Sequence, residues 1–487
     1  MLQPFIALFS IRQKHVNNGA RLTTIAKNNQ SSRQGLSMDF AAIGLNIPSI
    51  LLPKPGIDMS KWAVIACDQY TSEPEYWEKV GATVGKSPST LNLIYPEVFL
   101  EEAQADAERR ITGINATMQH YLDAGILQQE AQPGFILVDR QTCAVPSRKG
   151  LVVALDLEAY DYREGATTLI RATEGTILDR LPPRIKVRQG ASIELPHIMV
   201  LIDDPERTVI EPLFDRNLEL AYDFELMEGG GQIKGWRVND AASIAQVGAA
   251  LTQLADPAGF AAKYQVAGQA PVLYAMGDGN HSFATAKAIW EKLKVEAPDP
   301  AAIMDHPARY ALVELVNVHD PGLEFEAIHR VVFNADLAAM TAQAEAFYAA
   351  QGASFRCERY VDLAASAVQA QALKQAGRHL IPFVAGTECG LFVIDQPPLH
   401  LEVATLQTFL DHFLTQNRAA RIDYIHGEAP VSALGGKAGN IGFYLPAISK
   451  YDFFKTIILD GALPRKTFSM GDADEKRFYL ECRRIVR

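Results

Sequence analysis

The sequence has 487 residues, of which 48% are hydrophobic and 21% charged, so it is long enough to fill the cores of two or three domains. Its net charge of −11 argues against a nucleic-acid-binding surface. In addition, no run approaches the roughly 18 consecutive apolar residues of a membrane-spanning helix. The five cysteines form no CxxC pair, which supports neither a disulfide framework nor a zinc site and favours a reducing cytoplasm.

The first 37 residues are basic and contain no acid. We expect them to be a disordered tail or a stretch upstream of the true start at Met38, although their composition also resembles that of an organellar transit peptide. After the tail we expect three domains: an N-terminal α/β domain over 38–164, a central ParB/serine-kinase-like domain over 165–320 and a C-terminal α/β domain over 321–487.

Strand and helix patterns are mixed along the rest of the chain. Short apolar strands are predicted at 62–67, 134–140, 150–162, 197–204, 270–276, 310–318, 379–386 and 391–395. Helices are predicted within 95–125, 240–255, 280–294, 335–375 and 402–417, and a hairpin about a triple glycine at 224–238. This mixture indicates a multi-domain α/β (mixed α+β) protein with mixed sheets.

The stretch "AMGDGNHSF" at 275–283 lies between an apolar strand and a helix. Asn280 is predicted to cap that helix, whose free backbone N–H groups and dipole would attract an anion. Gly277 and Gly279 would let the backbone approach a ligand closely, and Asp278 would hold Mg²⁺ against phosphate oxygens. His281, in the first turn, would bond to the ligand. The same spacing also fits a tight turn with an Asx cap and a surface histidine.

Familiar nucleotide and hydrolase motifs are missing from the sequence. No loop matches GxxxxGK[ST], and the third glycine of GxGxxG is replaced by Ser282. HExxH and GxSxG are also absent, so zinc peptidase and serine hydrolase activities have no support.

Three weaker candidate sites lie elsewhere in the sequence. Glu174 follows an apolar strand among cations that include Arg171, so it is either a general base in a phosphate site or part of a surface salt-bridge cluster. Two further groups are candidate substrate-binding residues: His329 and Arg330 beside a strand, and Lys437 and Asn440 on a glycine loop.

Several motifs occur together in a characteristic order: "LIRATEGT", "GDGNHSFATAK", "HDPGLEFEAIHR" and "DGALPRKTFSM". With the early "LLPKPGIDMSKWAVIACDQYTSEPEYW", they resemble the DUF1015 family of unknown function from about residue 45 to the end. The two central motifs also resemble those of the ParB/sulfiredoxin superfold, especially the ADP-dependent free-serine kinases.

The resemblance to the free-serine kinases implies roles for individual site residues. Those kinases carry a Pro-His-Glu elbow whose Glu is the base, and an Asp-Gly-His-His-Arg elbow that cradles phosphate. Glu174 would be the base, although Ala172-Thr173 precede it here. Asp278, Gly279 and His281 would match the second elbow, but Asn280 replaces its first histidine and Ser282 its arginine. Without that arginine, the resemblance implies that another cation holds the phosphate and acts as the phosphate clamp. The candidates are Arg171, Lys287 and Arg330.

These features predict phosphoryl transfer between a nucleotide and a small hydroxy amino acid, with serine implied by the resemblance. The expected cofactors are Mg²⁺ with ADP or ATP, and the expected partners are small molecules, not nucleic acid or membrane. The alternatives are a phosphoserine phosphatase and a non-catalytic nucleotide- or metabolite-binding protein. A DNA-binding partition factor is disfavoured by the acidic composition.

Overall fold

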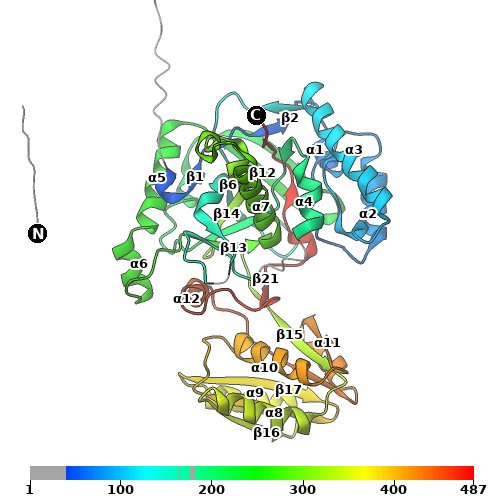
Figure 1. Ribbon diagram of the computed structural model, residues 1–487, viewed down its shortest axis with the longest axis vertical. Coiled ribbons are helices and arrows are strands. Elements are labelled where there is room, and N and C mark those ends of the chain that lie inside the picture. The colour runs from blue at the N-terminus through cyan, green and yellow to red at the C-terminus, as the bar shows by residue number, and fades with distance from the viewer. Residues whose placement is uncertain (1–39, 164, 176–180) are drawn as a thin grey trace, which may run out of the picture. The chain divides into compact units, whose positions relative to one another are not determined.

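The computed structural model describes residues 40–163, 165–175 and 181–487, so the basic tail at 1–37 lies outside the described residues (Figure 1). Helices and strands are mixed along the described chain, and the sheets contain both parallel and antiparallel pairs. The expected mixed α/β class is therefore confirmed. None of the helices in these ranges is long and apolar enough to cross a membrane.

The larger sheet has ten strands within the described residues. In order across the sheet they are β11 (Glu219–Glu225), β12 (Gln232–Val238), β5 (Phe135–Gln141), β6 (Arg148–Asp156), β14 (Tyr310–Asn317), β10 (Met199–Ile202), β13 (Tyr274–Asp278), β8 (Ile170–Arg171) and β7 (Tyr160–Asp161), while β1 (Leu45–Asn46) pairs with β6. The central strands β6 and β14 are buried along nearly their whole length, as their continuous apolar runs predict. The boundary expected near residue 164 falls inside this sheet, because β5 and β6 precede it and β8, β10, β13 and β14 follow it.

Local signals correctly predicted the hairpin and the helix that follows it. The hairpin arms are β11 and β12, and Gly231 in their connection has a φ of 81°. A side chain there would meet the Gln141 carbonyl oxygen at 2.0 Å, so glycine is required. α5 (Ala241–Leu254) begins after Asp240, whose carboxylate accepts a hydrogen bond from Ser243 N at 2.8 Å.

Helices cover one face of the larger sheet. The first group is α1 (Met59–Trp62), α2 (Pro74–Val84) and α3 (Gln104–Asp123). In α3, Ile114, Met118 and Tyr121 recur at helical spacing and belong to the same core as Val138 and Val152 of the sheet. Further along the sheet, a second core joins β10 and β14 to α6 (Pro257–Tyr264) and α12 (Lys450–Asp460).

The smaller sheet has seven strands in the described residues. They are β16 (Ser354–Tyr360), β18 (Glu388–Asp395), β17 (Arg378–Ala385), β20 (Asn440–Phe443), β15 (Glu326–Phe333) and β19 (Arg421–His426), with β21 (Phe468–Ser469) paired to β15. α8 (Leu337–Ala350) and α10 (Glu402–Gln416) cover one face, and α9 (Leu363–Leu373) and α11 (Glu428–Gly435) the other. The region predicted as helical at 335–375 thus contains a strand, β16, because pairing with β18 fixes its conformation.

Residues 461–487, called here the C-terminal segment, pair with elements far away in the sequence (red in Figure 1). The pairs are β21 with β15, β22 (Phe478–Tyr479) with β3 (Val64–Ile65), and β23 (Arg483–Arg484) with β9 (Ile193–Glu194). This segment therefore belongs to the core of the protein and passes close to the site described next.

Candidate functional site

The two predicted elbows leave neighbouring parallel strands and meet. β8 leads into the loop that carries Glu174, and β13 leads into the elbow before α7 (Asn280–Glu296). Thr173 Oγ1 donates a hydrogen bond to the Met276 carbonyl at 2.6 Å, and Thr173 N donates to Asn280 Oδ1 at 3.3 Å. Residues 107 positions apart in the sequence are thus bonded directly, and the two elbows converge.

The start of α7 differs from the prediction. Gly279, not Asn280, precedes the helix, and its φ of 79° lies in the left-handed region that glycine adopts easily. A Cβ there would lie 3.0 Å from Ile198 Cα, which also favours glycine. Asn280 is the first helical residue, and its amide bonds to Thr173. The prediction of Asn280 as the cap was wrong because a contact between the two loops, rather than a local cap, fixes its side chain.

Gly277 has a packing role beside the elbow. A Cβ at this position would lie 3.0 Å from Leu201 Cγ and 3.2 Å from the Met199 carbonyl oxygen, both on the neighbouring strand β10. The close fit between β13 and β10 therefore accounts for this glycine.

Asp278 is held as an anion at the end of β13. Its Oδ1 accepts a hydrogen bond from Gly279 N at 2.8 Å, and its Oδ2 lies 3.3 Å from Lys476 Nζ. Burial alone would raise the pKa of Asp278, but the Lys476 ammonium, His197 and the Gly279 N–H together lower that pKa below its ordinary value. Asp278 is therefore ionised at neutral pH.

Glu174 lies against the C-terminal segment. Its Oε1 accepts a hydrogen bond from Lys466 N at 3.1 Å, and Leu463 N donates to the Thr173 carbonyl at 2.7 Å. Burial raises the pKa of Glu174, Lys466 partly opposes that rise, and the negative Asp278 adds to it. A carboxylate with a raised pKa is a better proton acceptor near neutral pH than an exposed one. Glu174 thus combines a raised pKa with a position at the meeting of the two elbows.

Lys466 and Lys476 are the site residues that sequence reasoning missed. Lys466 lies 292 positions after Glu174, and Lys476 Nζ, beside Asp278, also donates to the Met470 carbonyl at 3.1 Å. The motif at 460–470 includes Lys466, so its place in the ordered set of motifs was a signal for that lysine. For Lys476 no local pattern existed.

The first turn of α7 presents His281 and Ser282. Ser282 Oγ lies 3.0 Å from His197 Nε2, and His197 Nδ1 lies 2.8 Å from the Tyr479 hydroxyl. The His281 carbonyl accepts a hydrogen bond from Thr285 Oγ1 at 2.7 Å, and its side chain is partly buried. A buried histidine and the C-terminal segment therefore orient Ser282.

The three cations suggested for the phosphate clamp have different environments. Lys287 Nζ donates to the Leu157 carbonyl at 2.9 Å and lies 2.6 Å from Glu291 Oε1, which holds it against the loop after β6 rather than at the elbow. Arg171 is buried, and its Nε donates to the Thr168 carbonyl at 2.7 Å. Its Nη2 is buried without a hydrogen-bond partner among the described residues.

Arg330 and its neighbour on β15 point to opposite sides of the smaller sheet. The Arg330 guanidinium stacks 4.7 Å from the Tyr424 ring centre, and its Nη2 donates a hydrogen bond to the Arg465 carbonyl at 3.3 Å. Arg465 precedes Lys466, the partner of Glu174, and the positive charge of Arg330 lowers the pKa of Glu174. His329 Nδ1 instead accepts a hydrogen bond from Leu445 N at 3.0 Å, and burial lowers its pKa. The structure thus brings Arg330, but not His329, toward the elbows.

The glycine loop with Lys437 and Asn440 lies away from the elbows. Lys437 is exposed, and Asn440 Nδ2 donates to the Leu434 carbonyl at 2.9 Å, which closes the turn after α11. Asn440 pairs with Phe333, at the end of β15 opposite to the end that pairs with β21. The loop has a structural explanation and does not join the site.

The residues around Asp278 do not fit a resident Mg²⁺ site. Both carboxylate oxygens of Asp278 are engaged, one by Gly279 N–H and the other by Lys476. Across the described ranges, no group of three or more acidic, histidine or cysteine side chains is arranged to hold a metal ion.

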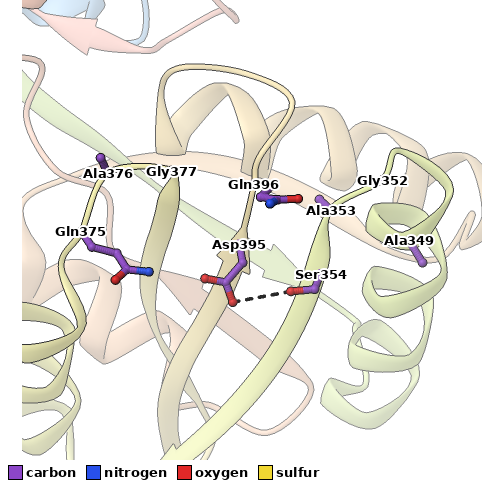
Figure 2. A pocket seen from close by; sticks show the side chains of 9 residues that line it. All are labelled: Ala349, Gly352, Ala353, Ser354, Gln375, Ala376, Gly377, Asp395 and Gln396. Carbon is purple, nitrogen blue, oxygen red and sulfur yellow. Dashed lines mark hydrogen bonds between the residues drawn. The ribbon is translucent and has the colours of Figure 1, made fainter.

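A hollow of about 770 Å³ at the end of the smaller sheet has no comparable set of charged side chains among its lining residues (Figure 2). Its walls are mostly small residues and amides from the ends of α8, β16 and β18, and Ser354 Oγ lies 3.5 Å from Asp395 Oδ2. Asp395 is already paired with Arg356 at 2.6 Å and with Arg378 at 2.5 Å. The converging elbows, and not this hollow, therefore form the candidate site.

A family model matches residues 51–413, and its description is "Protein of unknown function (DUF1015)". No curated protein matches the chain by sequence. Among solved structures, similar chains are a free serine kinase in complex with AMP (11% identity, TM-score 0.35, covering 68% of this chain and 90% of that one), a conserved hypothetical protein from Pyrococcus furiosus (12%, 0.33, 68% and 90%) and C-terminally truncated SbnI from Staphylococcus aureus (9%, 0.32, 66% and 82%). Likeness at this level carries no argument about activity.

Proposed function

The chain belongs to the DUF1015 family of proteins of unknown function, and we propose that it transfers a phosphoryl group between a nucleotide and a small hydroxy amino acid, with serine as the first candidate. The observation that carries this proposal is the convergence of a basic carboxylate, Glu174, with a glycine elbow at a helix start. Two lysines of the C-terminal segment add positive charge to the same place. The resemblance of the two elbows to those of free-serine kinases supports serine as the acceptor.

Phosphoryl transfer suits these groups because it needs alignment and charge stabilisation more than covalent catalysis. The first turn of α7 presents the backbone N–H groups of a helix start, and the helix dipole adds to their attraction for phosphate. The Lys476 ammonium lies beside this turn, and Arg171 has a buried nitrogen without a partner in the described part of the chain.

In the proposed reaction, the Glu174 carboxylate accepts the proton of the substrate hydroxyl. The hydroxyl oxygen forms a bond to the terminal phosphorus as the bond from that phosphorus to the bridging oxygen breaks. The shortened nucleotide leaves with the electron pair of the broken bond. Magnesium, when it is bound to the nucleotide, neutralises phosphate charge.

Phosphoserine formation tests this function. The full chain is incubated with serine, Mg²⁺ and either ADP or ATP, and the product is followed by ³¹P NMR. We expect phosphoserine that appears only when nucleotide and serine are both present. Release of phosphate from phosphoserine without a nucleotide would instead show a phosphatase. Nucleotide binding without turnover would show a binding protein, and either result would overturn the proposal.

We expect Lys476→Met to weaken nucleotide affinity by about 10- to 100-fold, because a charge-assisted hydrogen bond contributes about 1.5–3 kcal/mol. Calorimetry measures this, and the exposed, distant Lys437→Met is the matched control that should bind as the wild type does. Removing Lys476 also leaves Asp278 without its cation, so Lys476→Met/Asp278→Asn separates the two effects. Equal affinity of this double variant and the wild type would contradict a role of Lys476 in phosphate binding.

A further inference from the structure

A cavity of about 140 Å³ lies next to the first turn of α7. Ser282 and Thr285 of α7 contribute to its wall, as does His197, the partner of Ser282. The cavity is therefore adjacent to the turn at which the proposed function places phosphate, and one ligand can occupy both places.

The body of this cavity is apolar on two sides. Leu93 and Ile94, from the chain before α3, line one part, and Val187 and Ala191, from α4 (Leu181–Gln189) and the residues after it, line another. An apolar cavity of similar volume, about 150 Å³, is known to accept a flat aromatic molecule. The size and the lining of this cavity thus suit a flat, mainly apolar group rather than a chain of charged atoms.

One wall also carries a charged pair. Arg184 of α4 is bonded to Glu97, and both side chains line the cavity. Burial raises the pKa of Glu97 even though the Arg184 guanidinium opposes the shift, so this carboxylate is poorly hydrated. A hydrogen-bond acceptor and a donor therefore stand side by side on an otherwise apolar surface.

We propose that this cavity holds the base of the nucleotide whose phosphates lie at the α7 elbow, and that adenine is the base it fits best; this inference rests on the proposed function. A nucleobase has two apolar faces and a polar edge, which match the apolar walls and the charged pair. Adenine presents an exocyclic amino donor beside a ring-nitrogen acceptor, which complements Glu97 and Arg184.

Binding of the two halves of the ligand tests the proposal. Adenosine and inorganic pyrophosphate are titrated separately into the full chain by calorimetry. Val187→Phe and Ala191→Leu each fill part of the cavity, and we expect each to weaken adenosine binding by at least about tenfold and to leave pyrophosphate affinity unchanged. Ala376→Phe, which adds the same ring to the hollow of Figure 2, is the matched control and should leave both affinities unchanged.

Thermal melts confirm that each variant is folded. Because two different substitutions fill the cavity, a local distortion around one of them cannot explain a loss of binding in both. Wild-type adenosine affinity in both variants, or no adenosine binding by the wild type, would overturn the assignment of the cavity. If the filled variants lose adenosine binding and the wild type forms no phosphoserine, the assignment of the cavity to adenine stands. Only the proposed phosphoryl transfer is then refuted.

Discussion

The Glu174→Gln variant should form phosphoserine about 10²–10⁴-fold more slowly than the wild type, with nucleotide affinity close to normal. Glutamine keeps the size of the side chain, and its amide oxygen can still accept the hydrogen bond from Lys466 N. What it lacks is the ability to take a proton from the substrate hydroxyl. The loss is therefore expected in kcat, which initial-rate kinetics measures.

The pH dependence of the wild type should report the same group. Burial raises the pKa of Glu174, and a general base works only when it is ionised. Activity should therefore fall as the pH drops through this raised pKa, so that the acid limb of kcat/KM lies above about 4.3, the ordinary value for glutamate. Glu174→Gln should lack that limb.

Glu345→Gln is the matched control, because Glu345 is exposed on α8, a helix that packs on the smaller sheet. It should have wild-type kinetics and the wild-type acid limb. A Glu174→Gln variant with wild-type turnover would eliminate Glu174 as the base, while nucleotide binding at the elbow would remain to be judged by the Lys476 variants.

The Arg477→Met variant should lose about 3–5 kcal/mol of unfolding free energy, the usual cost of removing one partner from a buried ion pair. Arg477 is 3% exposed and bridges Glu314 of β14 and Glu481, which are 1% and 0% exposed. Methionine fills the space of the side chain but leaves two carboxylates in the core without this cation. Urea denaturation measures the loss, and Trp62 is a suitable fluorescent probe because its Nε1 donates to the Leu480 carbonyl at 3.0 Å.

The pH dependence of this loss of unfolding free energy is set by Glu314. Burial alone would raise its pKa, but Arg477 and Arg148 bring that pKa below its ordinary value. The stability that this ion pair contributes is therefore present above the ordinary glutamate pKa and is lost as the pH falls through the lowered one. The difference in stability between wild type and Arg477→Met should accordingly narrow in acid.

Arg109→Met is the control for this prediction. Arg109 lies 3.2 Å from Asp106 on the exposed surface of α3, where such pairs contribute about 0–1 kcal/mol. A loss in Arg477→Met no larger than in Arg109→Met would show that Arg477 does not anchor the C-terminal segment. Because Arg477 follows Lys476 directly, we also expect the weakened anchor to displace that lysine from Asp278.

Features that depend on neighbouring residues could be predicted from the amino-acid sequence alone. Glycines that allow a tight reversal predicted the β11–β12 hairpin, and the Asp240 cap with the residues after it predicted α5. The strand and helix on either side of "GDGN" were predicted in the same way, since periodicity and turn residues act within a few positions along the chain. The resemblance to known motifs singled out Glu174 and Asp278, and their shared role stays a prediction.

Features that depend on contacts between distant residues are fixed by tertiary packing. The side chain of Asn280 is fixed by Thr173 rather than by its own helix, and β16 is a strand because β18 lies beside it. Lys466 and Lys476 reach the elbows because the C-terminal segment pairs with β15 and β3. No local sequence pattern encodes such placements. Two groups that are close in the sequence meet through local backbone geometry alone. Glu174 and Lys466, which are almost 300 residues apart, meet only because the whole core packs around them.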